Sequence, residues 1–189
     1  MVVLPKADWV YFNNVLSSGQ SSMSKCYQSV SDKEFNLSGV NITYVVKEDY
    51  VATPQDFFDK LNEIFSFNLD SCAEIDTAKC LNFYTKEDDA LNKDWKGVVW
   101  CNPPYGREQA KFVLKAYEES LKHNSTVVVL IPARPDTKLW QNTIFPNANQ
   151  ICFIKGRLKF GGAKESAPFP SALVVFGKEV DLSNFGYCI

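Results

Sequence analysis

Soon after residue 50, hydrophobic positions begin to recur with the period of a helix. Apolar side chains fall on one helical face at Phe57, Phe58, Leu61, Ile64 and Phe65. Just before them, Thr53 and Pro54 are the residue types preferred at the N-cap and at the first helical position. We therefore expect a helix with Thr53 as its N-cap and with this face buried.

Short apolar runs typical of buried strands recur along the rest of the chain. They span residues 67–70, 81–85, 97–101, 126–131, 151–154 and 172–176. The run TVVVLI at 126–131 is apolar on both faces, as in a central parallel strand. A second helical face is predicted at Ala110, Val113, Leu114, Tyr117 and Leu121. Strands that alternate with helices predict an α/β fold with a doubly wound sheet.

The first 48 residues differ from the rest and are interpreted as an N-terminal arm or small subdomain. Residues 17–31 (SSGQSSMSKCYQSVS) are polar and weakly periodic, and only residues 41–46 (NITYVV) have the composition of a strand. We place the main domain at residues 49–189, and the role of the arm stays open.

Composition narrows the class of protein. The chain has 189 residues, 46% of them hydrophobic, which is enough for a sizeable core and excludes a disordered chain. No apolar run approaches about 18 residues, and Met1 to Tyr11 lacks the features of a signal peptide. We expect an intracellular protein, in cytoplasm or nucleus, with no membrane partner.

Cysteine and histidine usage predicts no metal site. The six cysteines lack zinc-ribbon spacing, and they are expected to be reduced in an intracellular protein. His123 is the single histidine, and we expect it at the surface or as a cap at a helix end. A Ser-His-Asp site or a histidine-based metal site is therefore not predicted.

Charge is unevenly divided between the two halves of the chain. Residues 1–94 contain 8 basic and 15 acidic residues, whereas residues 95–189 contain 12 basic and 7 acidic residues. A positive C-terminal half indicates an anionic partner. A chance sorting of interspersed surface charges is the alternative.

The residues with the clearest chemistry are Asn102-Pro103-Pro104-Tyr105, directly after the predicted strand 97–101. Ligands of open α/β sheets bind outside the carboxyl ends of the strands. Two prolines stiffen the loop there, the Asn102 amide and a proline carbonyl offer two acceptors, and Tyr105 offers an aromatic face. A rigid turn at a strand end, without function, is the alternative interpretation.

Two acceptors beside an aromatic ring suit a planar NH₂ group on a conjugated ring, such as the exocyclic amine of adenine. Its lone pair is delocalised, and hydrogen bonds accepted from its protons favour a nitrogen with a localised lone pair. Base–aromatic stacking contributes about 1–3 kcal/mol and would hold the base in place. A base within a duplex must first be flipped out to reach such a loop.

From Ala52 to Phe176 the chain resembles the phage-type Dam family of DNA N6-adenine methyltransferases. The matching stretches occur in the family's order and are ATPQDFF (52–58), FNLDSCA (67–73), DDAL (88–91) with DW (94–95), VVWCNPPYG (98–106), LIPARPDTKLW (130–140), IKGRLKFGG (154–162) and APFPSALVVF (167–176). The resemblance implies a Rossmann-like, doubly wound methyltransferase sheet with a reversed C-terminal strand in residues 49–189. It also implies DNA as partner and S-adenosylmethionine (SAM) as cofactor.

The resemblance assigns roles to individual residues. Asn102, Pro103, Pro104 and Tyr105 match the catalytic motif. Asp70 matches the acid near the methionine part of SAM, and its alternative role is the N-cap of a following helix. Asp89 matches the acid that binds the adenine amine of SAM, with Asp88 as a rival. The expected cofactor-binding residues are Thr53, Pro54, Asp70, Ala73, Asp89 and Leu91. The glycine-rich first loop of many methyltransferases is absent, as in the phage-type family.

Substrate-side candidates lie in the C-terminal half and are Arg134, Lys155, Arg157, Lys159, Phe160 and Phe169. The basic residues suit phosphate contacts, although Arg134 has Asp136 as an alternative ion-pair partner. The two phenylalanines suit contact with a flipped base, although they could also be core residues. No separate target-recognition domain is visible, and a monomer and a homodimer both stay open.

Two alternatives to DNA adenine methylation remain open from the residues alone. An Asn-Pro-Pro-Tyr loop also suits an RNA adenine or a protein glutamine methyltransferase, because it binds any planar amide or amine. A non-catalytic nucleic-acid-binding module that keeps the fold is the second alternative.

Overall fold

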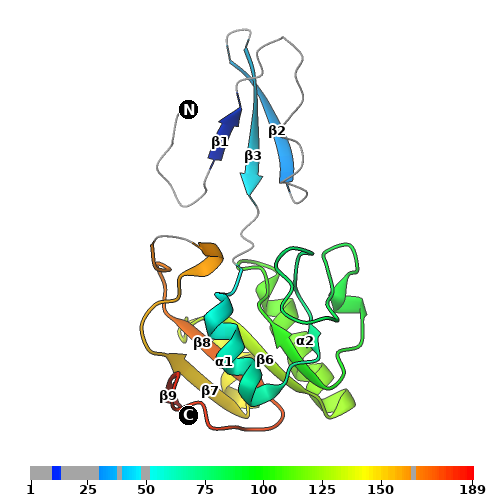
Figure 1. The fold of residues 1–189 in the computed structure, drawn as a ribbon, viewed down its shortest axis with the longest axis vertical. Coiled ribbons are helices and arrows are strands. Elements are labelled where there is room, and N and C mark those ends of the chain that lie inside the picture. The colour runs from blue at the N-terminus through cyan, green and yellow to red at the C-terminus, as the bar shows by residue number, and fades with distance from the viewer. Residues whose placement is uncertain (1–9, 14–29, 38–39, 48–51, 163–164) are drawn as a thin grey trace. The chain divides into compact units, whose positions relative to one another are not determined.

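The protein, seen in a computed structural model, divides into two compact units, Met1–Tyr50 and Val51–Ile189 (Figure 1). The structure describes residues 10–13, 30–37, 40–47, 52–162 and 165–189. In the first unit it describes the course of the backbone, and in the second unit it also describes side chains. All of the site residues predicted above, from Thr53 to Phe169, belong to the second unit.

The described part of the first unit is a three-stranded antiparallel sheet. Strand β3 (Val40–Lys47) lies between β1 (Val10–Asn13) and β2 (Val30–Leu37). The strand predicted at 41–46 is β3. Strands β1 and β2 were not predicted, because segments such as VSDKEFNL lack a continuous apolar alternation. Most of the polar stretch 17–31 lies outside the described residues.

The second unit contains a mixed sheet of six strands. The strands are β4 (Leu69–Asp70), β5 (Val98–Cys101), β6 (Thr126–Pro132), β7 (Gln150–Ile154), β8 (Ser171–Phe176) and β9 (Gly186–Cys188). Their order is β4-β5-β6-β8-β7-β9. Strands β4, β5 and β6 are parallel, and β8 is antiparallel to both of its neighbours. The predicted α/β class is confirmed, with a mixed sheet.

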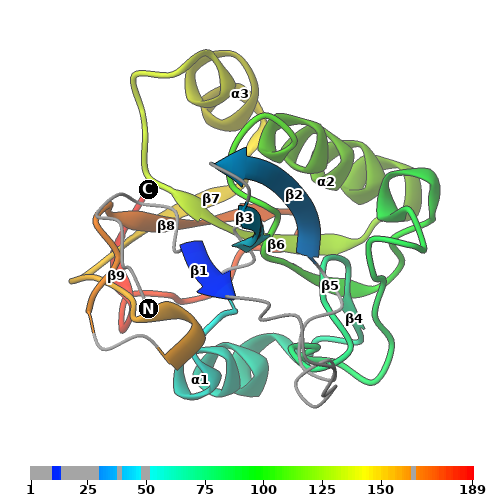
Figure 2. The same ribbon diagram turned by 90° about the horizontal axis from the view of Figure 1, so that it is seen from above.

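Helices cover both faces of this sheet. Figure 2 shows α1 (Gln55–Phe65) on one side and α2 (Gln109–His123), with the short α3 (Phe145–Asn147), on the other. The core on the α1 side contains Phe57, Phe58, Leu61, Phe65, Trp100, Val128, Leu130, Leu173 and Val175. On the opposite face, Tyr117 of α2 contacts Phe176 of β8, with ring centroids 5.9 Å apart. Because strand side chains alternate between faces, each central strand supplies both cores.

The structure corrects three details of the predicted elements. Pro54, not Thr53, is the N-cap of α1, and no side chain caps this helix. Three residues assigned to buried helix faces, Ile64, Leu114 and Leu121, are exposed. The predicted strand 81–85 is reduced to a single bridge between Phe83 and Asp70. Strand β9 was not predicted, because GYC is short and Tyr187 faces solvent.

Two further predictions concern membrane-spanning helices and the state of the cysteines. None of the helices in the described part of the chain is both long and apolar enough to cross a membrane. The described cysteines, which are Cys72, Cys80, Cys101, Cys152 and Cys188, are all free thiols. Cys26 lies outside the described residues.

A buried carboxylate attaches α2 to the segment before β5. Glu119 is 2% exposed and accepts hydrogen bonds from the Trp95 backbone N–H at 2.7 Å and from Lys115 Nζ at 2.8 Å. Trp95 is fully buried, and its indole N–H donates to the Ala90 carbonyl at 2.9 Å. These bonds fix the chain where it enters β5, and β5 leads directly to Asn102.

We expect Glu119→Ala to destabilise the protein by about 3 kcal/mol, because it leaves a buried N–H and a half-buried ammonium group without their acceptor. Urea unfolding measures the change. Glu118→Ala, at the exposed neighbouring position, is the control and is expected to change stability by less than about 0.5 kcal/mol. Equal losses in the two variants would contradict an anchoring role for Glu119.

Candidate active site

Strands β4, β5 and β8 bring polar residues to one edge of the six-stranded sheet. The carboxyl ends of the parallel strands β4, β5 and β6 share this edge, where Asp70 ends β4 and Asn102 follows β5. Strand β8 runs the opposite way, so its first residue, Ser171, pairs with Pro132 at the same edge. This edge is where open α/β sheets bind ligands.

Asp70 is a buried carboxylate at this edge, 2% exposed. Its Oδ1 accepts from the Cys72 N–H at 3.2 Å, and its Oδ2 accepts from the Lys79 N–H at 3.0 Å. Burial raises the pKa of Asp70 to about 7, although these two amides act to lower it. Asp70 is not a helix N-cap, because a loop follows β4. A buried acid that titrates near neutral pH is poised to bind a cation.

Thr53 lies at the start of α1 and is 4% exposed. Its hydroxyl is buried and has no hydrogen-bond partner among the described residues. The preceding carbonyl, of Ala52, accepts from the Gly161 N–H at 2.8 Å. This bond joins the start of α1 to the turn at residues 160–162, so Thr53 and Phe160 belong to the same region of the structure.

The two candidate acids between β4 and β5, Asp88 and Asp89, have different environments. The Asp88 carboxylate accepts from both the N–H and the hydroxyl of Thr85, each at 2.9 Å, and these bonds lower its pKa. Asp88 therefore stabilises the turn that spans residues 85–88. Asp89 is exposed, has a left-handed backbone with φ 53°, and its carboxylate accepts a hydrogen bond from the Asn92 side-chain amide at 2.6 Å.

Two further candidates for cofactor binding, Ala73 and Leu91, also lie between β4 and β5. Leu91 is half-buried in the turn that follows Asp89. Ala73 is 2% exposed, and its N–H donates to the Tyr84 carbonyl at 3.0 Å. Ala73 therefore contributes small size and a fixed backbone rather than a free amide.

The Asn102–Tyr105 loop leaves the sheet from Cys101, which is fully buried. Pro103 is buried, whereas Asn102, Pro104 and Tyr105 are half-buried. The side-chain oxygen of Asn102 and the hydroxyl of Tyr105 are both closed to solvent. Burial raises the pKa of the Tyr105 hydroxyl well above its ordinary value, so it stays protonated at neutral pH and is no base.

Tyr105 belongs to an aromatic cluster that also contains Phe160 and Phe169. The Tyr105 ring lies edge-to-face with Phe169 at 5.4 Å and with Phe160 at 6.1 Å between centroids. Phe160 and Phe169 are 6.4 Å apart. The structure thus brings together three predicted site residues that are far apart in sequence.

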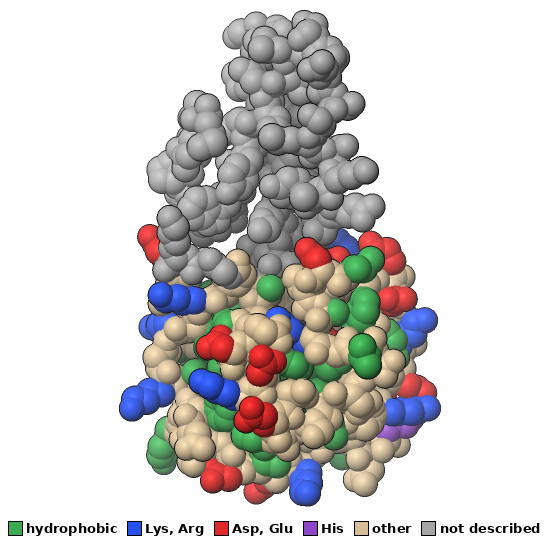
Figure 3. Space-filling model, in the orientation of Figure 1, with side chains coloured by type: hydrophobic (Ala, Val, Ile, Leu, Met, Phe, Trp, Pro, Cys, Tyr) green, Lys and Arg blue, Asp and Glu red, His purple; other side chains and the backbone are tan. Residues whose placement is uncertain are grey.

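The predicted basic residues form a strip rather than a pocket. Lys155, Arg157 and Lys159 are exposed, whereas Leu158 and Phe160 pack against the core on the α1 side. Arg134 is exposed and forms no ion pair with Asp136, although both residues are described. Acidic and basic side chains are interspersed on the face shown in Figure 3, so this face carries no single large basic patch.

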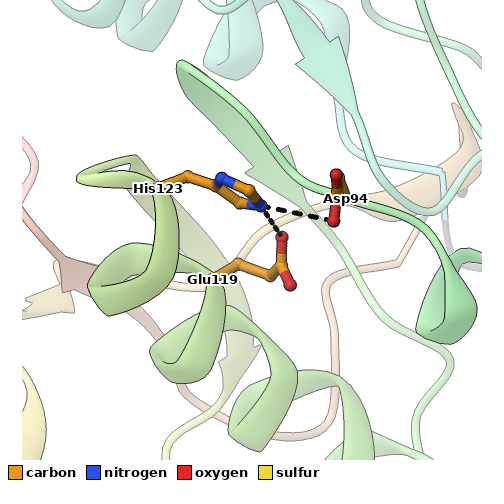
Figure 4. A group of neighbouring side chains, drawn as sticks. All are labelled: Asp94, Glu119 and His123. Carbon is orange, nitrogen blue, oxygen red and sulfur yellow. Dashed lines mark ion pairs between the residues drawn. The ribbon is translucent and has the colours of Figure 1, made fainter.

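Asp94, Glu119 and His123 form a group with the spacing of metal ligands, within 4.8 Å of one another (Figure 4). His123 is half-buried at the end of α2, with Nε2 3.3 Å from Asp94 and 3.4 Å from Glu119. Both carboxylates already bind lysines, Asp94 through Lys122 at 2.6 Å and Glu119 through Lys115 at 2.8 Å. The geometry favours an ion-pair network that joins α2 to the segment before β5.

Comparison with known proteins identifies the family. Residues 41–180 match the family described as DNA N-6-adenine-methyltransferase (Dam). The DNA N-6-adenine-methyltransferase of Haemophilus phage HP1 (strain HP1c1) is 36% identical over 138 residues, covering 68% of this chain and 79% of that protein. The protein of the same name from Escherichia phage T1 is 32% identical over 123 residues, covering 64% of this chain and 50% of that protein. This chain belongs to the Dam family.

As a Dam-family protein, the chain is an adenine-specific DNA methyltransferase, in agreement with the family resemblance of its motifs. The matched residues include β3 of the first unit except Val40, and the whole edge from Thr53 to Ser171. This reaction needs a site for a methyl donor and a site for adenine.

Sequence reasoning missed two polar side chains near the Dam-family motifs. Ser171 Oγ and Gln109 Nε2 are buried and have no hydrogen-bond partner in the described part of the chain. Ser171 begins β8, and Gln109 begins α2 just after the Asn102–Tyr105 loop. The sequence contains only one indication of Ser171, a polar residue that begins a fully apolar strand.

Proposed function

We propose that this Dam-family enzyme transfers a methyl group from SAM to the exocyclic N6 of an adenine that has been flipped out of duplex DNA onto the Asn102–Tyr105 loop. The observation that carries the proposal is the placement of Asn102 and Tyr105 directly after β5, beside the buried carboxylate of Asp70 at the end of β4. An amine-binding loop and a cation-binding acid then share one sheet edge.

The residues at the edge fit SAM. The Asp70 carboxylate suits the ammonium group of the methionine part, because a charge-assisted hydrogen bond offsets the cost of its burial. The buried Thr53 hydroxyl lacks a partner among the described residues and is available to a polar group. Asp89 suits the adenine amine better than Asp88, whose oxygen is occupied by Thr85. Pro54, Ala73 and Leu91 supply apolar or close-packed walls.

When bound, SAM supplies an electrophilic methyl group. The chain's own contribution is to orient the adenine amine toward it. Asn102 Oδ1 and a carbonyl of Pro103 or Pro104 accept hydrogen bonds from the two N6–H groups, which localises the nitrogen lone pair. The prolines hold these acceptors rigidly, so little reorganisation is needed when the base arrives.

Tyr105 holds the base by stacking, and its aromatic neighbours complete the base site. We assign Phe160 and Phe169 to the substrate side because both rings contact Tyr105. Lys155, Arg157 and Lys159 suit contacts with DNA phosphates, since every second side chain along this strip is an exposed cation. Arg134 suits the same role at the end of β6.

The same proposal covers the domain organisation. Residues 49–189 form the methyltransferase domain, with a Rossmann-like sheet in which β8 is a reversed strand, and residues 1–48 are an N-terminal arm or small subdomain. The antiparallel pairing of β8 with β6 and β7 supports this description. The enzyme works as a monomer or homodimer inside the cell.

The test of the reaction is incorporation of labelled methyl groups from SAM into duplex DNA, RNA and a glutamine-containing peptide in parallel. We expect label in DNA, on N6 of adenine after nuclease digestion. Label confined to RNA or to the peptide would overturn the proposed substrate. Absence of saturable SAM binding by calorimetry would instead favour a non-catalytic module.

Tyr105→Ala is expected to lower kcat/KM by about 10- to 100-fold, because stacking contributes about 1–3 kcal/mol per base. Tyr105→Phe should retain activity within about threefold, since the Tyr105 hydroxyl has no hydrogen-bond partner among the described residues. Steady-state methylation of a duplex with one target site measures both variants. Equal activity of the two variants would contradict stacking.

A further inference from the structure

Ser171 has a buried hydroxyl that the rest of the described structure does not use. The residue is 1% exposed, and Oγ has no hydrogen-bond partner among the described residues. A buried polar group without a partner costs about 1–3 kcal/mol. An alanine would fit the apolar strand β8 without that cost, so the hydroxyl points to a role outside the folded core.

The backbone around Ser171 is fixed at the candidate active site. Ser171 pairs with Pro132 at the carboxyl end of β6, and the Pro170 carbonyl accepts from the Ala133 N–H at 2.8 Å. Phe169, two residues earlier, contacts the Tyr105 ring at 5.4 Å. Ser171 is therefore held next to the aromatic cluster that surrounds Tyr105.

Strand alternation predicts that Ser171 and Asn102 lie on the same side of the sheet. Leu173 and Val175 of β8 and Trp100 of β5 share the core on the α1 side. Ser171 precedes Leu173 by two residues, so it continues this face. Asn102 follows Trp100 by two residues, and the same alternation predicts the same side for it.

The sheet register sets the separation between these two residues. Strands β5 and β8 are separated by β6, which corresponds to about 10 Å across the sheet. Extending the register from Cys101 through Val129 to Val174 puts Ser171 two residues farther out than Asn102, or about 7 Å. A hydroxyl and an amide oxygen that reach toward one another across this separation suit neighbouring groups of a purine.

We infer that Ser171 is a specificity-determining residue, whose hydroxyl donates a hydrogen bond to a ring nitrogen of the flipped adenine, next to the amine held by Asn102. Both ring positions adjacent to the amine, N1 and N7, are acceptors. The inference rests on the proposed flipping of the base onto the Asn102–Tyr105 loop. Because Oγ is closed to solvent, the base must displace the groups that cover it in order to bind.

The test combines Ser171→Ala with substrates that lack one ring acceptor. Duplexes carry adenine, 1-deazaadenine or 7-deazaadenine at the target position, and kcat/KM is measured for the wild type and the variant. On adenine, we expect Ser171→Ala to lose about tenfold. On one of the two analogues, the kcat/KM of the wild type should be lower than on adenine by a similar factor. The kcat/KM of Ser171→Ala should be the same on that analogue as on adenine. Ser183→Ala, at an exposed serine, is the control for removal of a hydroxyl.

Thermal unfolding separates this role from a structural one. Because the Ser171 hydroxyl has no partner in the described fold, Ser171→Ala should keep or raise Tm. If the alanine variant fails to fold, Ser171→Cys replaces it in the test, because cysteine has nearly the same shape and its thiol is only a weak donor. The same loss of kcat/KM on adenine is expected. The inference is overturned if Ser171→Ala keeps the wild-type kcat/KM on adenine. It is also overturned if the variant loses a further factor of kcat/KM on both analogues, as large as the factor that the wild type loses. A wild type inactive on adenine duplexes overturns the proposed function as well.

Discussion

Asn102→Ala is expected to lower kcat by about 10²–10³-fold, the loss typical of removing one fixed group that stabilises charge in a transition state. The Asn102 oxygen acts on the adenine amine, so its removal leaves the lone pair delocalised and the amine poorly oriented. Single-turnover methylation of a one-site duplex measures the chemical step without product release.

SAM binding is the readout that assigns this role to the substrate side. Calorimetric titration should give a SAM affinity for Asn102→Ala within about threefold of the wild type. Asn142→Ala, at an exposed asparagine far along the chain, is the control for the substitution and should retain full activity. A loss of SAM affinity as large as the loss of kcat would show that Asn102 holds the cofactor instead.

The fold was predictable where the apolar pattern is long or two-sided. TVVVLI and SALVVF are apolar enough to be strands in any context, and both occupy the centre of the sheet. The local pattern gave wrong predictions of burial at positions where tertiary contacts determine which side chains are buried. Leu114 and Leu121 are exposed, whereas Glu119 is buried on the same helix because Trp95 and Lys115 satisfy its carboxylate.

The candidate site was predictable as far as its motifs are local. Asn102 and Tyr105 follow a strand, and their placement at a sheet edge follows from that order alone. The contacts of Tyr105 with Phe160 and Phe169 depend on the turn after β7, which no spacing rule predicts. The choice between Asp88 and Asp89 depends on hydrogen bonds within a single turn. The unused hydroxyl of Ser171 is visible only after every neighbour is placed.

Asp70→Asn is expected to weaken SAM binding by at least about tenfold at pH 8, because a hydrogen bond to a charged group contributes about 1.5–3 kcal/mol. For the wild type, affinity should also depend on pH. Burial raises the pKa of Asp70 to about 7, so the carboxyl is increasingly neutral below pH 7 and loses its attraction for an ammonium group. Affinity should fall by up to about tenfold per pH unit between pH 7 and pH 5, whereas the asparagine variant should be nearly independent of pH.

Stability should respond to pH in the opposite direction, which distinguishes this residue from a purely structural acid. The folded protein holds the Asp70 proton up to about pH 7, whereas the unfolded chain releases it near the ordinary aspartate pKa of 3.8. Between these values the folded state binds more protons, so the free energy of unfolding falls as pH rises. Urea unfolding from pH 5 to pH 8 should show this decline in the wild type and a flatter profile in Asp70→Asn. A wild type that gains stability over this range relative to the variant would mean that Asp70 is already ionised and paired within the fold, and the proposed ammonium contact would lose its basis.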